Sequence, residues 1–162
     1  MKAMAIFLLA ALPVLACGGL WFLAQRSAQV EPELGLVDGR LRPVSAKPNA
    51  VCSEAGTPED ARVEPLRFQG SGEAALRALG TLVESGERAE VVTSQAGYLH
   101  VVFRTALFGF HDDFEARLDP EASVLHVRSA SRVGHSDLGA NRRRIETLRE
   151  RWKQTGERVG TF

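Results

Sequence analysis

A cluster of arginine and small polar residues between positions 128 and 142 has the composition of an anion-binding site. Arginine holds carboxylates and phosphates through paired N–H donors, and the first turn of a helix offers free backbone N–H groups to the same ligands. The periodicity described below places a strand end and a helix start in this segment. We therefore expect a site for a carboxylate, a phosphate or a lipid headgroup, formed by Arg128, Ser131, Arg132, Asp137, Asn141 and Arg142.

The same cluster also fits a structural corner, and the sequence favours this interpretation. Asp137 would then cap the helix, while Arg128 or Arg132 would form ion pairs with acidic residues of the neighbouring strand. The candidates for these structural ion pairs are Asp112, Asp113 and Glu115. Adjacent residues of a strand point to opposite faces, so Asp112 and Asp113 are poor partners for a two-carboxylate acid–base pair.

Histidines elsewhere in the chain show no spacing typical of a catalytic or metal site. They lie on different predicted strands or turns, no two are four residues apart on a helix, and the Gly-x-Ser-x-Gly motif of many hydrolases does not occur. We expect no cofactor and no metal, and local sequence identifies no catalytic residue. A hydrolase whose serine and histidine meet only in the folded chain stays open as an alternative.

Segments with regular apolar spacing would position these residues. Alternating apolar side chains indicate strands, and apolar side chains three or four residues apart indicate helices. Two amphipathic helices suffice to cover one face of an antiparallel sheet. We predict an α+β domain with an antiparallel sheet of four to five strands and two helices packed on one face. In chain order its segments are a short strand at 63–68, a helix at 71–85, strands at 90–94, 98–105, 110–118 and 123–131, and a helix from 136 or 137 to 153.

The N-terminal segment is predicted to be a membrane helix. Residues 3–24 carry no charge, and a helix of this length spans about 33 Å, enough for the hydrocarbon core of a bilayer. A bacterial lipoprotein signal is the alternative, because Val14, Leu15 and Ala16 precede Cys17, which would then be lipidated. In either case the domain is exported. A soluble core helix is disfavoured, because a helix without a polar face must be enclosed on all sides.

Composition sets the remaining limits. Twenty basic residues balance 20 acidic ones, which argues against a dedicated nucleic-acid binder, and two cysteines are too few for a disulfide framework. Pro, Gly, Ser and charged residues without sustained periodicity indicate an extended linker before the domain. We predict an anchor or signal at 1–26, a linker at 27–62, the α+β domain at 63–155 and a tail at 156–162.

Three stretches of sequence resemble a known family. They are 47–53 (KPNAVCS), 109–115 (GFHDDFE) and 127–142 (VRSASRVGHSDLGANR). Together they are similar to the bacterial and plastid family called domain of unknown function 1499, over roughly residues 34–152. The resemblance implies an exported or membrane-anchored protein and no established reaction. Cys52 stands where the family pattern has serine, and His135 where tyrosine is common.

These observations predict a membrane-anchored protein of the bacterial cell envelope, with its domain in the periplasm or on the cell surface. We expect a non-catalytic binding or interaction module. Its partners would be the membrane, through residues 3–24, and an anionic ligand, a lipid headgroup or an envelope protein, but not nucleic acid. The alternatives are the hydrolase above and a lipid or small-ligand binder. The latter would need a cavity between sheet and last helix, lined by Phe103, Phe110, Phe114 and Trp152.

Overall fold

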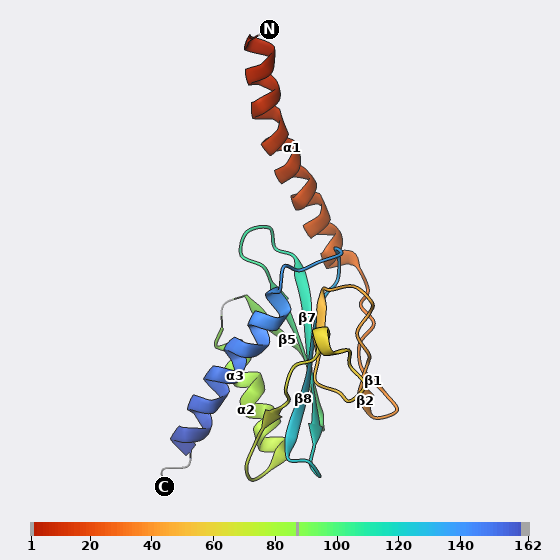
Figure 1. The fold of residues 1–162 in the computed structure, drawn as a ribbon. Coiled ribbons are helices and arrows are strands. Elements are labelled where there is room, and N and C mark those ends of the chain that lie inside the picture. Colours follow the sequence, from red (N-terminus) through yellow and green to blue (C-terminus); the bar gives the residue numbers. More distant parts are fainter. Residues whose placement is uncertain (1, 87, 160–162) are drawn as a thin grey trace.

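The computed structural model describes the backbone of residues 2–86 and 88–159 and the side chains of residues 14–86 and 88–155. Figure 1 shows helix α1 projecting from a domain in which two further helices lie against one sheet. The elements in chain order are α1 (Lys2–Gln29), β1 (Leu36–Val37), β2 (Arg40–Leu41), β3 (Ala50–Cys52), the 3-10 helix η1 (Glu59–Ala61), β4 (Leu66–Arg67), α2 (Gly72–Glu84), β5 (Ala89–Gln95), β6 (Tyr98–Arg104), β7 (His111–Asp119), β8 (Val124–Ser131) and α3 (Ala140–Val159).

The main sheet is antiparallel and confirms the predicted α+β class. Over the described residues it has six strands in the order β3-β8-β7-β6-β5, with β4 also pairing with β8. The predicted number of four to five strands is therefore wrong. The strand that was missed is β3, which has only three residues and is too short to show alternation. Strands β1 and β2 form a separate two-stranded hairpin, and both lie with β3 and η1 in the segment predicted as a linker.

Helices α2 and α3 cover one face of the sheet and form the main core with it. The hydroxyl of Ser71 caps α2 by accepting the N–H of Ala74 (3.4 Å), and the apolar stripe of this helix turns inward. Its buried side chains pack with those of α3 against the central strands. The largest fully buried ones include Leu79, Val83, Phe114, Leu125, Val127 and Ile145.

Helix α3 begins later than predicted. Leu138 and Gly139 both have positive φ angles, of 53° and 79°, so they cannot belong to a right-handed helix. The regular turns therefore start at Ala140 rather than at 136 or 137. At its other end the backbone stays helical through Val159, beyond the predicted end at 153 and into the segment 156–162 predicted as a tail.

The second face of the sheet is covered by the chain that follows α1. Leu41, Cys52 and Tyr98 form a small apolar cluster on this side. The alternation along β7 also places the charged residues Asp113, Glu115 and Arg117 on this face, away from the helices. Residues on the two faces of β7 thus meet entirely different surroundings.

Among the side chains that are described, helix α1 contacts the domain near its C-terminal end. Ala24 and Ser27 are buried, and the Ser27 hydroxyl donates to Ala24 O (2.6 Å) and accepts the N–H of His111 (3.0 Å). Residues 14–23, including Cys17, are exposed. Among the described residues, no helix combines the length and apolar character that crossing a membrane requires. Residues 3–13 of the predicted membrane span lie outside the part of the chain whose side chains are described.

Candidate functional site

The predicted anion site is centred on Asn141, which is fully buried at the start of α3. Its amide nitrogen donates to the backbone oxygen of Asn49 and to Ser131 Oγ, both at 3.0 Å. Its side-chain oxygen accepts the hydroxyl of Ser129 at 2.6 Å. Asn141 thereby joins α3 to β8 and to the chain entering β3, and its side-chain donors and acceptor are already used within the domain.

Asp137 occupies the backbone donors at the start of α3. One carboxylate oxygen accepts the N–H of Asn141 (2.7 Å) and the other accepts the N–H of Gly139 (2.9 Å). A helix N-terminus attracts anions because its N–H groups lack partners and carry partial positive charge. Here an internal carboxylate fills that position, so the helix start does not offer these two groups to an external anion.

Asp112 pairs with Arg144, a residue that the sequence analysis did not select. Asp112 is buried on the helix-covered face, and its Oδ2 lies 2.6 Å from Arg144 Nη2. The Arg144 guanidinium also lies 4.5 Å from the centre of the Phe103 ring, donates to Ser129 Oγ (2.9 Å) and contacts Asn141 Oδ1. A buried carboxylate on an apolar face requires a cation, and α3 supplies it instead of β8.

Asp113 lies on the opposite face with two partners. Arg132 donates to both of its carboxylate oxygens at 2.8 Å, and His100 Nε2 lies 2.9 Å from Oδ1. Burial alone would raise the pKa of Asp113, but the hydrogen bonds from His100 and Arg132 outweigh it and hold the pKa below its ordinary value. Arg132 is consequently held by an internal carboxylate.

Glu115 is the next charged residue along the same face and is fully buried. It accepts the Tyr98 hydroxyl (2.7 Å), the Gly35 backbone N–H (2.8 Å) and Arg128 Nη1 (2.6 Å). Burial and the hydrogen bond to Glu115 raise the pKa of Tyr98. Among the described residues, the buried Nε of Arg128 has no hydrogen-bond partner.

A third ion pair of this second face lies further along β7. Arg117 donates to both carboxylate oxygens of Glu54 (2.8 and 3.1 Å), and the Leu41 N–H donates to the same carboxylate (3.1 Å). Burial raises the pKa of Glu54, but these hydrogen bonds, led by those from Arg117, bring it below its ordinary value. The second face of β7 therefore carries ion pairs at Asp113, Glu115 and Arg117 in succession.

Two serine–histidine contacts bear on the hydrolase alternative. Ser53 Oγ lies 3.2 Å from His126 Nδ1, and Ser27 Oγ lies 3.4 Å from His111 Nδ1. Ser53 Oγ also accepts the backbone N–H of Val127 at 2.8 Å, and His126 Nδ1 lies 3.2 Å from the backbone oxygen of Ser53. The Ser27 hydroxyl already donates to a backbone oxygen of α1. A nucleophile needs its proton directed at the base and its oxygen open to substrate, whereas both hydroxyls here join neighbouring segments.

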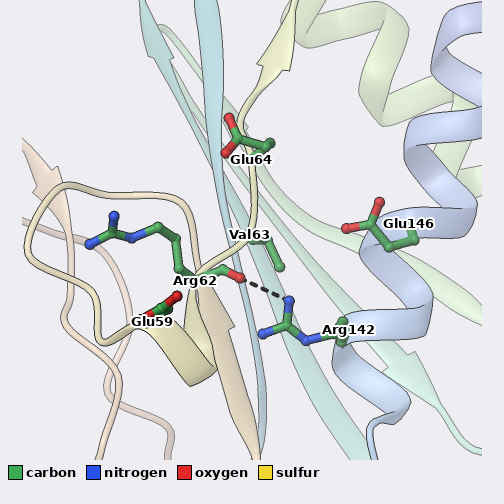
Figure 2. A pocket seen from close by; sticks show the side chains of 6 residues that line it. All are labelled: Glu59, Arg62, Val63, Glu64, Arg142 and Glu146. Atoms are coloured by element: carbon green, nitrogen blue, oxygen red, sulfur yellow. Dashed lines mark hydrogen bonds between the residues drawn. The ribbon is translucent and has the colours of Figure 1, made fainter.

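The larger of two described surface depressions has a volume of about 490 Å³ and lies beside the start of α3 (Figure 2). Arg142 lines it and donates to the backbone oxygens of Arg62 (2.8 Å) and Asp60 (2.6 Å). Of the predicted anion-site residues, Arg142 alone is among those lining it. Its full lining is Glu59, Arg62, Val63, Glu64, Arg142 and Glu146.

The aromatic residues predicted to line a ligand cavity do not form a single wall. Phe103 packs edge-on against the fully buried Phe114, with ring centres 6.2 Å apart, and Phe110 packs against Phe108 in the β6–β7 loop. The Trp152 indole donates to Arg67 O at 2.7 Å. Neither described depression lies between the sheet and α3 at these residues.

The site and the fold together define a small α+β domain with helices on one face of an antiparallel sheet and ion pairs on the other. The family model for the protein of unknown function DUF1499 matches residues 40–151, which is more than half of the chain. The chain belongs to this family, as the three stretches of sequence predicted. The match runs from β2 into α3 and leaves out α1. No curated protein matches the chain.

Proposed function

We propose that this protein is a membrane-tethered domain that works outside the cytoplasm as a non-catalytic binding or interaction module. The observation that carries the proposal is helix α1. It stands away from the domain (Figure 1), and six large apolar side chains on it are between 41 and 72% exposed. They are Val14, Leu15, Leu20, Trp21, Phe22 and Leu23.

The free energy of transferring these side chains from water favours a lipid environment. Burying one fully exposed large apolar side chain is worth about 1.5–3 kcal/mol, and because these six are on average a little over half exposed, together they amount to roughly 5–10 kcal/mol. By sequence, the uncharged segment extends from residue 3 to residue 24. The domain leaves residues 14–23 of α1 uncovered, and a bilayer is the surrounding that an uncharged segment of 22 residues fits.

The non-catalytic part of the proposal is supported by how the charged groups are used. The carboxylates of Asp112, Asp113 and Glu115 each have an arginine partner inside the domain. Catalytic groups are instead expected to converge on a cavity where a substrate can approach. The arrangement therefore supports a rigid scaffold whose exposed surface makes contacts, and it does not favour the hydrolase alternative.

Vesicle flotation of the full chain tests the tether. Wild-type protein should float with phospholipid vesicles, and the triple variant Leu15→Glu, Leu20→Glu, Phe22→Glu should stay in the dense fraction. These three side chains are exposed, so the domain should keep its fold, which circular dichroism verifies. Val92→Glu is the matched control, because Val92 is 54% exposed but lies on β5. A wild-type protein that stays in the dense fraction, or a triple variant that floats equally well, would overturn the tether.

A C-terminal reporter enzyme that becomes active only after export tests the compartment. Activity in cells is expected for the full-length fusion. An inactive reporter on a fusion that is present in the membrane fraction would place the domain on the cytoplasmic side and refute this part of the proposal.

A further inference from the structure

Two loops of the domain lie at the end from which α1 projects. One joins β6 to β7 (residues 105–110), and the other joins β8 to α3 (residues 132–139), as Figure 1 shows. We call these the two membrane-side loops. Each carries one leucine that is almost completely exposed: Leu107 at 82% and Leu138 at 84%.

Hydrogen bonds place both loops next to the base of α1. The N–H of His111, the first residue after the β6–β7 loop, donates to Ser27 Oγ of α1. The carbonyl of His111 accepts the N–H of Arg132, the first residue of the β8–α3 loop, at 3.3 Å. One residue therefore connects α1 and both membrane-side loops.

Leu138 is fixed in its outward position. Its φ of 53° is a left-handed conformation that is unfavourable for a residue other than glycine. Its N–H donates to Ser136 Oγ (3.2 Å), and its carbonyl accepts Arg143 Nη1 (2.8 Å). Strained residues are retained where the surroundings fix them, and such positions concentrate at functional sites. Within the described domain the exposed Leu138 side chain contributes little core burial that would offset this strain.

Leu107 lies in a loop that is closed by its own hydrogen bonds. Thr105 accepts the N–H of Gly109 on its carbonyl (3.0 Å) and the N–H of Phe110 on its hydroxyl (2.9 Å). The rings of Phe108 and Phe110 pack edge-on at 6.3 Å behind this turn. These contacts fix the backbone of the loop that carries the exposed Leu107.

We propose that Leu107 and Leu138 insert into the headgroup–acyl boundary of the bilayer that holds α1, so that the domain rests on the membrane through its two membrane-side loops. This inference rests on the proposed membrane tether. The occupant is a lipid surface because both loops are hydrogen-bonded through His111, directly or at its carbonyl, to the last turn of α1, the helix whose exposed apolar side chains the bilayer would hold. Exposed apolar side chains that flank an anchoring segment typically sit at this depth. The Arg143 guanidinium, held on the carbonyl of Leu138, would then lie at the level of the lipid phosphates.

A fluorescent probe that reports the polarity of its surroundings tests this orientation in the full chain. The labelled sites are Leu107→Cys and Leu138→Cys, each in a Cys17→Ala background, and the buried Cys52 is left in place. Ala122→Cys is the matched control, because Ala122 is exposed in the β7–β8 turn, at the other end of the nine-residue strand β7. The proteins are reconstituted in vesicles of phosphatidylcholine with a minority of phosphatidylglycerol, with and without brominated acyl chains.

The expected result is a blue shift and several-fold stronger bromine quenching at 107 and 138 than at 122. The variant Leu107→Glu, labelled at 138, should still float through α1 but should lose part of this quenching. Floating protein with equal quenching at all three sites, or with none at 107 and 138, would overturn this inference and leave the tether intact. Protein that does not float would overturn the tether, and with it this inference.

Discussion

Replacement of Arg132 decides between a binding site and a structural corner. In the structure both Arg132 donors to Asp113 are 2.8 Å from its oxygens, and both side chains are largely buried. Arg132→Met leaves Asp113 buried with His100 as its remaining side-chain partner. Breaking a buried ion pair by removing one partner costs about 3–5 kcal/mol. Because the His100 hydrogen bond persists, we expect the free energy of unfolding to fall by about 3 kcal/mol at pH 7.

The pH dependence gives this prediction a second signature. The pKa of Asp113 is lowered in the fold, so its contribution to stability is present above the unfolded pKa of about 3.9 and is lost as pH falls through the folded pKa. In Arg132→Met the main pKa-lowering charge is gone, while burial still raises the pKa of Asp113. The stability difference between wild type and variant should therefore narrow as the pH falls below about 4.

Urea unfolding of the full chain in a non-ionic detergent, followed by circular dichroism, measures both effects. Arg104→Met is the matched control, since its ion pair with Glu90 on the neighbouring strand is exposed and should contribute less than about 1 kcal/mol. If Arg132→Met changed the unfolding free energy no more than Arg104→Met does, Arg132 would not be committed to the scaffold. The structural account of this corner would then be wrong, and Arg132 would be available to a ligand.

Three further predictions concern single residues. Asn141→Ala should lower the free energy of unfolding by about 2–3 kcal/mol in the same assay, because it leaves buried partners such as Asn49 O and Ser129 Oγ unsatisfied. A change below about 0.5 kcal/mol would contradict a structural role for the hydrogen bonds of Asn141. Tyr98 is the only tyrosine of the chain, and its pKa is raised above the ordinary value of 10. We therefore expect no ultraviolet absorbance of phenolate from the folded protein at pH 10, and its appearance when the protein unfolds at higher pH. A titration midpoint near 10 in the folded protein would refute the buried hydrogen bond to Glu115. Leu138→Gly should leave the free energy of unfolding unchanged or raise it by up to about 1 kcal/mol in the same assay, since it removes left-handed strain. A clear decrease in the free energy of unfolding would mean that the Leu138 side chain contributes to the fold.

The sequence predicted the long elements of the domain because their patterns repeat. Strands β6, β7 and β8 have seven to nine residues each, enough for apolar and polar side chains to alternate visibly. Strand β3 has three residues and depends on its antiparallel pairing with β8, which no local pattern reveals. The start of α3 was misplaced because Leu138 adopts a backbone conformation that leucine rarely takes.

The partners of the charged residues were harder to predict than their presence. The sequence shows that the carboxylates of β7 need cations, and it offers Arg128 on the next strand and Arg132 directly after it. Arg144 could have been found from its spacing: it follows Asn141 by three residues, which places the two side chains on the same side of a helix. Glu54 and Arg117 are separated by 63 residues. The residues around Glu54 and around Arg117 do not indicate that the two side chains pair, because the pair forms only when the chain folds.

The ion pairs on the second face of the sheet also determine how α1 is joined to the domain. Glu115 holds the backbone of Gly35, and Glu54 holds the backbone of Leu41, so the chain after α1 is fixed to the sheet at two buried carboxylates. Ser27 fixes the last turn of α1 to β7. A buried ion pair adds little net stability compared with apolar packing, but its geometry is specific. The chain between α1 and β3 is therefore docked on the sheet. If α1 lies in a bilayer, as proposed, the bilayer also sets the orientation of the domain, with the β7–β8 turn directed away from the lipid.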